Sequence, residues 1–198
     1  MEINPQKIEG KWEEGWAMDL HTTSSIPITD EAGNVIKWNN TYPPIAGELC
    51  QLKYCKDKSK VDNIAKSVAD FFNKKKEQWN IDMVISVPPS DTERTFQPVT
   101  ELVNAISKLS GLSVDNTTLK KNEATPPLKT IDDPEARREI LKNAFSVETD
   151  ALKGKNILIF DDIYRSGETL NAVSDVIQQQ GNAEKVYVLT VTKTRVKK

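Results

Sequence analysis

The chain has 198 residues, of which 37% are hydrophobic and 28% are charged, and its formal net charge is −2. This length fits one domain, or one domain with a small appendage, and the apolar content is sufficient for a buried core. Long-range electrostatics do not draw a slightly acidic chain to nucleic acid or to an anionic membrane, so neither is an expected partner.

The first 57 residues differ in composition from the rest. They contain three of the four tryptophans and several turn signals, which predicts short strands separated by tight turns, with one hairpin over residues 11–21. We expect residues 1–57 to form a small β-rich hood and residues 58–198 to form an α/β core. Core packing is expected for Trp12, Trp16 and Trp38. The chain opens without an apolar run, so no signal peptide is expected, and no run is long enough to span a membrane.

The sequence contains two cysteines, Cys50 and Cys55. A disulfide between them is geometrically allowed. A zinc site would need two more ligands, and the only histidine, His21, lies far away in the sequence. We therefore expect two free thiols in a reducing, cytoplasmic setting. His21 itself is expected to be a polar residue at the end of a strand.

From about residue 58 the hydrophobic pattern becomes an alternation of helices and strands. In chain order it predicts a helix from residue 58 with a lysine-rich end, a strand at 81–87, a helix at 97–111, a short strand at 112–114, a helix at 134–145, a strand at 155–160, a helix at 167–181 and a strand at 185–192. Residues 120–134 are polar and contain prolines, which predicts a long loop. This alternation indicates a mainly parallel sheet with helices on its faces, and such sheets bind ligands at the carboxyl ends of their strands.

Two adjacent carboxylates, Asp161 and Asp162, follow the strand at 155–160. Carboxylates only accept hydrogen bonds, which suits the hydroxyl groups of a sugar. The loop after them leads into a helix, whose free N–H groups and positive dipole end suit a phosphate. The loop residues are Tyr164, Arg165, Ser166, Gly167, Glu168 and Thr169. These residue types predict a receptor for a sugar phosphate.

The run ILIFDDIYRSGETL, residues 157–170, resembles the phosphoribosyl pyrophosphate (PRPP) signature of the type I phosphoribosyltransferases. The resemblance implies the fold of that family. It also implies that Asp161 and Asp162 act as the catalytic pair that holds the ribose hydroxyls, and that residues 164–169 wrap the 5′-phosphate. Family members bind Mg²⁺ together with PRPP, so the ion is expected near Asp161 and Asp162, held with PRPP, and no direct metal ligand is expected. The implied reaction displaces pyrophosphate with a small nitrogenous acceptor, as in nucleotide metabolism.

Two further stretches, VISVPPSDTERTF (84–96) and ARREILKNAFSV (136–147), resemble the ComF-like branch of that family. The expected pyrophosphate loop consists of Pro88, Pro89, Ser90 and Arg94. The expected lid cations, which border the long loop, are Lys129, Arg137 and Arg138. An alternative for Pro88 and Pro89 is that they only end the strand. An alternative for each lid cation is that it lies in solvent on a helix or loop.

These patterns favour a Mg²⁺-dependent phosphoribosyltransferase. Two other classes stay open: a PRPP- or nucleotide-binding regulator on the same fold, and an accessory protein in DNA uptake, which the ComF-like resemblance alone suggests. The acceptor is not identified, because its contacts are expected in the variable hood. A homodimer is left open.

Overall fold

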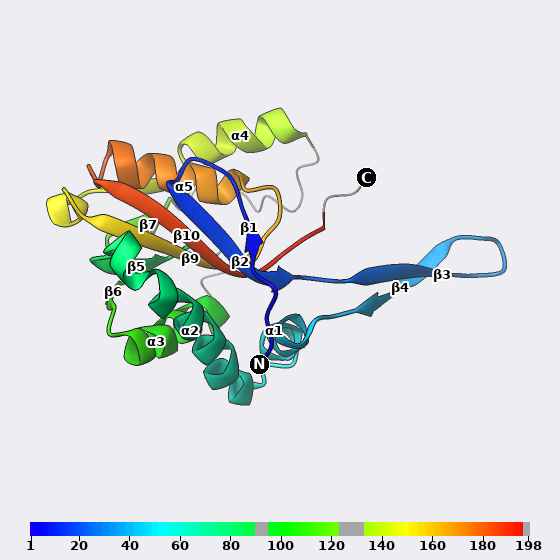
Figure 1. Cartoon of the computed structure of the whole chain (residues 1–198). Coiled ribbons are helices and arrows are strands. Elements are labelled where there is room, and N and C mark those ends of the chain that lie inside the picture. Colours follow the sequence, from blue (N-terminus) through cyan, green and yellow to red (C-terminus); the bar gives the residue numbers. More distant parts are fainter. Residues whose placement is uncertain (90–94, 123–132, 196–198) are drawn as a thin grey trace.

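The structure is a computed structural model of the whole chain, and it describes residues 1–89, 95–122 and 133–195. A central six-stranded sheet carries helices on both faces (Figure 1). Its strand order is β1-β2-β10-β9-β5-β6, in which β1 pairs antiparallel and every other pair is parallel. The predicted α/β class with a mainly parallel sheet is therefore confirmed.

The sheet strands are β1 (Gln6–Lys7), β2 (Glu14–Leu20), β5 (Met83–Ser86), β6 (Ser113–Asp115), β9 (Asn156–Tyr164) and β10 (Lys185–Lys193). The α-helices are α1 (Pro44–Tyr54), α2 (Val61–Trp79), α3 (Pro98–Ser110), α4 (Pro134–Lys142) and α5 (Glu168–Gln179). Short 3₁₀ helices lie at η1 (Lys58–Lys60) and η3 (Asp150–Leu152). Two smaller sheets pair β3 (Ser24–Thr29) with β4 (Val35–Thr41), and β7 (Leu119–Lys121) with β8 (Phe145–Val147).

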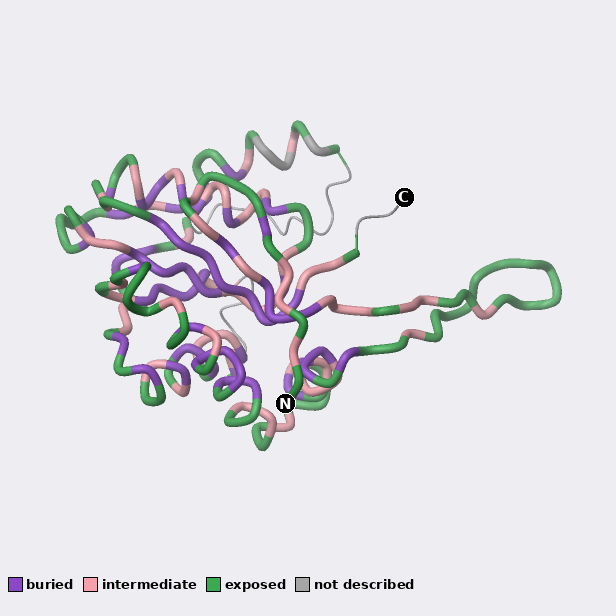
Figure 2. Tube along the Cα trace, in the orientation of Figure 1, coloured by how far each residue is buried: buried purple, intermediate pink, exposed green. Residues whose placement is uncertain are grey.

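Each face of the sheet has its own hydrophobic core. Helices α1, α2 and α3 cover one face, and α4 and α5 cover the other (Figure 1). Along β9 the side chains alternate: Leu158 and Phe160 belong to the first core, and Ile157 and Ile159 belong to the second. Strands β9 and β10 are therefore buried on both faces, as Figure 2 shows, and they form the rigid base of the site.

The predicted helices lie close to their expected positions. In α2 the periodic positions Ile64, Ala65, Val68 and Phe72 are buried. Helix α3 ends at Gly111, which adopts the left-handed conformation (φ 76°) that a helix C-terminus favours. No helix in the described part of the chain is long and apolar enough to cross a membrane.

The N-terminal segment departs from the prediction. The hairpin expected at 11–21 is wrong, because Glu14–Leu20 forms a single strand that runs parallel to β10. Helix α1 was not expected, although Pro44 at its first turn is a common helix start. Within residues 1–57, the β3–β4 hairpin is the part that projects from the body (Figure 1). The acceptor-binding role of this hood stays a prediction.

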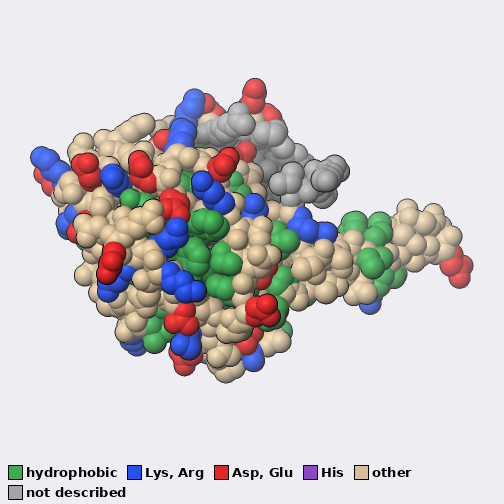
Figure 3. Space-filling view, viewed as in Figure 1, with side chains coloured by type: hydrophobic (Ala, Val, Ile, Leu, Met, Phe, Trp, Pro, Cys, Tyr) green, Lys and Arg blue, Asp and Glu red, His purple; other side chains and the backbone are tan. Residues whose placement is uncertain are grey.

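The projecting hairpin is largely exposed along its length (Figure 2). Apolar side chains gather on it in Figure 3, and its exposed large hydrophobic residues are Ile26, Val35, Ile36 and Trp38. The expected core position of Trp38 is wrong, because 56% of that residue is exposed. Trp12 and Trp16 are half-buried against the two cores, as predicted. Both cysteines are free thiols, as predicted: Cys50 is half-buried and Cys55 is exposed.

Strand β2 is tied to helix α2 by the carboxylate of Glu14. This carboxylate accepts hydrogen bonds from the Lys75 ammonium (2.8 Å), the Trp79 indole (2.8 Å) and the Trp16 indole (2.6 Å). Burial alone would raise the pKa of Glu14, but the hydrogen bonds and the Lys75 charge hold the pKa below its usual value of 4.5. A depressed carboxyl pKa means that folding favours the ionised form.

We expect Glu14→Gln to lower the free energy of unfolding by about 1.5–3 kcal/mol, the range for a charge-assisted hydrogen bond. Because the folded pKa is depressed, this stability is present above pH 4.5 and is lost as the pH falls through the folded pKa. Thermal unfolding at pH 7 and pH 3 measures it. The neighbouring Glu13, which is exposed, provides the control Glu13→Gln. If the stabilities of Glu14→Gln and Glu13→Gln differ by the same amount at pH 7 and at pH 3, the prediction is contradicted.

Candidate functional site

The two acids lie within the last part of β9, not after its end. The prediction that this strand stops at Phe160 is wrong, because β9 stays paired with β10 as far as Tyr164, which lies opposite Lys193. The uninterrupted strand β10 provides a hydrogen-bonding partner for the whole stretch. On the other side, the pairing with β5 ends at Ser86, opposite Phe160. Asp161 and Asp162 therefore lie where β5 has turned away, at the carboxyl edge of the sheet.

Asp162 has a cationic partner on helix α1. The Lys53 Nζ lies 2.5 Å from Asp162 Oδ2, and the two side chains are only 18% and 15% exposed. A pair of adjacent carboxylates at the end of a buried strand is thus partly neutralised by a lysine from a distant segment. No motif indicates Lys53, because it lies between the two cysteines in a segment whose composition predicts short strands and tight turns.

Asp161 has a different environment from its neighbour. One of its oxygens accepts a hydrogen bond from the Asp162 backbone N–H (2.8 Å). Burial, followed by the negative charge of Asp162, raises the pKa of Asp161 from 3.8 to about 7. In the described residues no side chain forms a hydrogen bond or ion pair with Asp161. This carboxylate is therefore an acceptor that a ligand hydroxyl can satisfy.

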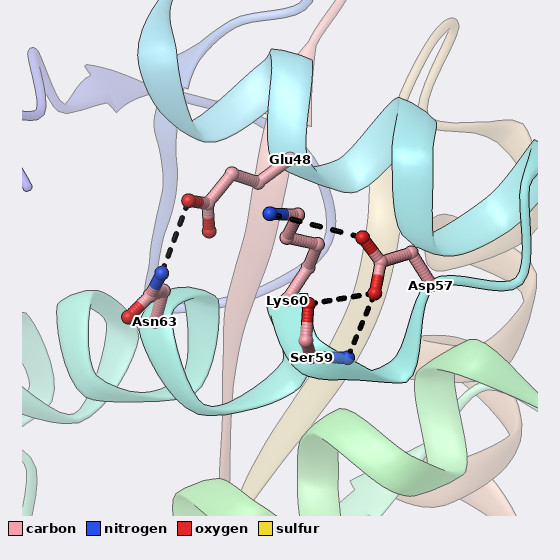
Figure 4. A network of polar contacts seen from close by, with 5 residues as sticks. All are labelled: Glu48, Asp57, Ser59, Lys60 and Asn63. Carbon is pink, nitrogen blue, oxygen red and sulfur yellow. Dashed lines mark hydrogen bonds and ion pairs between the residues drawn. The ribbon is translucent and has the colours of Figure 1, made fainter.

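Polar contacts fix the connection between α1 and α2 (Figure 4). Asp57 caps η1 by accepting from the Ser59 N–H (3.1 Å) and hydroxyl (2.6 Å), and Lys60 lies 3.7 Å from it. The Asn63 amide donates to Glu48 (3.1 Å), which joins the start of α2 to the middle of α1. This network joins α1, which carries Lys53, to the start of α2.

The predicted phosphate loop connects β9 to α5. Tyr164 is anchored, because its hydroxyl donates to the Glu9 carbonyl (3.2 Å) and its ring lies edge-on to Trp12. Arg165 and Ser166 are exposed. The Ser166 hydroxyl donates to Glu168 Oε2 (3.1 Å), so the Glu168 carboxylate is held at the helix start.

Gly167 begins α5 in the left-handed conformation (φ 79°), and no side chain caps this helix. The first N–H groups of α5 are therefore available to a ligand, and Thr169 lies in the same turn. Such a helix start can accept an anion, and the phosphate-binding role of this loop stays a prediction.

We expect Gly167→Ala to destabilise the protein by more than the cost of placing an alanine in the left-handed conformation. A Cβ at this position would lie 2.9 Å from the Tyr164 hydroxyl and 3.0 Å from its ring. Gly154 provides the matched control, because it has a similar φ of 69° and open space around its Cα. The left-handed cost, about 1–2 kcal/mol, should appear in both variants. Thermal unfolding should show a larger loss for Gly167→Ala, together with weaker binding of ribose 5-phosphate. Equal losses would contradict the proposed contact.

The start of the predicted pyrophosphate loop lies beside the acids. The Val87 N–H donates to the Phe160 carbonyl (3.0 Å), and the half-buried Pro88 and Pro89 follow directly. Ser90 and Arg94 lie outside the described residues, as does Lys129 of the predicted lid. Arg137 and Arg138 lie on α4, but the structure does not describe their side chains. The lid and the second half of the pyrophosphate loop therefore stay predictions.

His21 lies nearer to this site than its sequence position indicated. It directly follows β2, and its Nδ1 is 3.1 Å from the Thr192 hydroxyl of β10. Burial, and then the charges of Lys53 and Arg165, lower the pKa of His21 below its usual value of 6.5. The imidazole is therefore neutral at pH 7, and it belongs to the same electrostatic neighbourhood as Asp162.

The described residues contain no group of three or more histidine, cysteine, aspartate or glutamate side chains that could hold a metal ion.

No protein-family model matches this sequence, and no curated protein sequence matches it. Among solved structures, adenine phosphoribosyltransferase from Saccharomyces cerevisiae is 13% identical and has a TM-score of 0.43, with 85% of this chain and 83% of that chain covered. Adenine phosphoribosyltransferase from Thermoanaerobacter pseudethanolicus is 12% identical, with a TM-score of 0.44 and coverages of 86% and 94%. An allosteric regulatory enzyme of purine biosynthesis is 16% identical, and this chain covers 25% of its length. Because these TM-scores are below 0.5, we base the function on the residues of the site.

Proposed function

We propose that this protein transfers the 5-phosphoribosyl group of PRPP to a nitrogenous acceptor and releases pyrophosphate. One observation carries the proposal. Asp161 and Asp162 lie at the open carboxyl edge of a buried parallel strand, and the loop after them leads into an uncapped helix N-terminus. Acceptors for a diol and donors for a phosphate are thus held on one continuous segment.

Different residues bind different parts of the substrate. Asp161 and Asp162 accept hydrogen bonds from the ribose hydroxyls, and these donors relieve the repulsion between the two carboxylates. The N–H groups at the start of α5 and the hydroxyls of Ser166 and Thr169 donate to the 5′-phosphate. Lys53 fixes Asp162 in place, so the ribose is held in one orientation. The protein accelerates the reaction mainly through positioning and through donors arranged in advance.

Magnesium fits this donor set in part. The ion prefers oxygen ligands, and the Asp161 carboxylate provides one, whereas Asp162 is already bound to Lys53. Asp161 would hold the ion jointly with oxygens of the substrate, and the bound ion would supply positive charge next to the leaving pyrophosphate.

The test is equilibrium binding of PRPP by calorimetry, with and without Mg²⁺. We expect binding in Mg²⁺ and an affinity at least about tenfold lower without it, which corresponds to about 1.4 kcal/mol. Pyrophosphate release with a panel of nitrogenous bases then separates a transferase from a PRPP-binding regulator. Absence of PRPP binding in Mg²⁺ would overturn the proposal.

Membership of the ComF-like branch, a role in nucleotide metabolism and a cytoplasmic location stay predictions.

A further inference from the structure

A cavity of about 270 Å³ opens beside the phosphate loop, and its lining is strongly basic. Lys7, Ile8, Glu9, Tyr164, Arg165, Lys193, Thr194 and Arg195 line it. Four of these residues are cations and one is an acid, on a chain whose net charge is −2. Positive charge is therefore concentrated in one hollow of an otherwise slightly acidic protein.

The cavity is built from three segments that hold each other in place. The Thr194 N–H donates to the Tyr164 carbonyl (2.8 Å), which joins the end of β10 to the phosphate loop. Lys193 Nζ donates to the Lys7 carbonyl (3.3 Å), and Arg195 donates to the Thr23 carbonyl (3.0 Å). These contacts direct the basic groups to the edge of the sheet that carries Asp161 and Asp162.

The cations of the cavity lack a carboxylate partner within the chain. In the portion of the molecule that the structure describes, Lys53, Lys11 and Lys75 form ion pairs, whereas none of the four cations of the cavity does. Only Glu9 offsets them in the lining itself. Four cations that share a hollow repel one another, and an anionic ligand relieves this repulsion.

The cavity adjoins the loop assigned to the 5′-phosphate and shares Tyr164 and Arg165 with it. Residues 166–169, which provide the helix N-terminus and the hydroxyls, are not in its lining, although Arg165 is. Tyr164, the last residue of β9, and Arg165 after it both line the cavity, and the same strand carries Asp161 and Asp162. The charge of Arg165 acts on Asp161. The cavity therefore borders the ribose site, where an acceptor can lie next to the sugar.

We infer that this cavity binds the acceptor and that the acceptor is acidic: a nitrogenous compound with one ring that carries a carboxylate. This inference rests on the proposed phosphoribosyl transfer. A volume of about 270 Å³ is below the usual range of roughly 300–1,000 Å³ for ligand sites, which favours one ring over two. The guanidinium groups of Arg165 and Arg195 bind carboxylates through paired hydrogen bonds.

Matched pairs of compounds that differ only in charge test the inference. Pyridine-3-carboxylate is compared with pyridine-3-carboxamide, and uracil-6-carboxylate with uracil, by calorimetry on the full chain with ribose 5-phosphate present. In at least one pair we expect the carboxylate to bind at least about tenfold more tightly than its neutral partner. Lys193→Gln and Arg195→Gln should each remove most of this preference and leave PRPP affinity unchanged. Lys185→Gln, at the other end of β10, is the control that should keep the preference.

The outcomes distinguish the two proposals. If neither pair shows a preference for the carboxylate, the inference is overturned while PRPP binding still supports the transferase. If Lys193→Gln and Arg195→Gln weaken PRPP and not the carboxylates, the cavity serves the phosphate of the substrate, and the inference is again overturned. If the parent protein binds no PRPP, the proposed function fails, and the acceptor assignment fails with it.

Discussion

Asp161→Asn and Asp162→Asn are each expected to weaken binding of PRPP by about 10- to 150-fold, because each removes a charge-assisted hydrogen bond worth about 1.5–3 kcal/mol. Calorimetry in Mg²⁺ measures the loss. Asp70→Asn is the control, since Asp70 forms only an exposed pair with Lys66. If both site variants bind PRPP as the parent does, the acids do not hold the sugar.

The same two variants should differ in stability. Asp161→Asn removes a partly buried charge that Asp162 repels, so the melting temperature should hold or rise. Asp162→Asn removes the partner of Lys53, so the melting temperature should fall. If both variants lose stability, the two acids instead have a structural role at the start of helix α5.

The pH dependence of the first variant gives an independent check. The folded pKa of Asp161, about 7, is above its usual value of 3.8, so folding favours the protonated form. The resulting stability is fully present below pH 3.8 and is lost as the pH rises through about 7. Asp161→Asn has no titrating carboxyl here and so does not lose this stability as the pH rises. The difference in melting temperature, variant minus parent, should therefore increase between pH 4 and pH 8. A difference that stays constant over this range would contradict the raised pKa of Asp161.

Lys53→Met should be the most destabilising change in the site. It leaves the Asp162 carboxylate largely buried and without its cation. Breaking a fully buried pair costs about 3–5 kcal/mol, and the partial exposure of this one lowers our expectation to about 2–3 kcal/mol. At about 2–4 °C per kcal/mol, the melting temperature should fall by roughly 4–12 °C.

A double-mutant cycle isolates the pair. Lys53→Met combined with Asp162→Asn should recover most of the loss, because no unpaired charge remains. Lys66→Met is the control, since the Lys66–Asp70 pair is exposed and such pairs contribute about 0–1 kcal/mol. Strictly additive effects of Lys53→Met and Asp162→Asn would show that the contact carries no stability.

Local pattern was sufficient to predict the core and the position of the loop between β9 and α5, whose chemical role stays a prediction. Helix α2 followed from the spacing of Ile64, Val68 and Phe72, and the phosphate loop followed from the residues between β9 and α5. Neither the cationic partner nor the basic cavity could be found in this way. Lys53 meets Asp162 only because α1 packs against β10, and Lys193 meets the Lys7 carbonyl only because β1 and β10 both pair with β2. Such pairings depend on topology, which local periodicity does not contain.

The order of strands in the sheet has a consequence for synthesis on the ribosome. Strand β2 is the first long strand of the central sheet to emerge, but its parallel partner β10 is almost the last segment of the chain, with Glu14 opposite Tyr187. At about 5–20 residues per second, roughly 10–30 s separate the two strands. Throughout that interval the strand that contains Ala17 and Met18, which are fully buried in the finished protein, lacks its parallel partner. Chaperones therefore have time to bind the N-terminal segment of each nascent chain before its sheet can close.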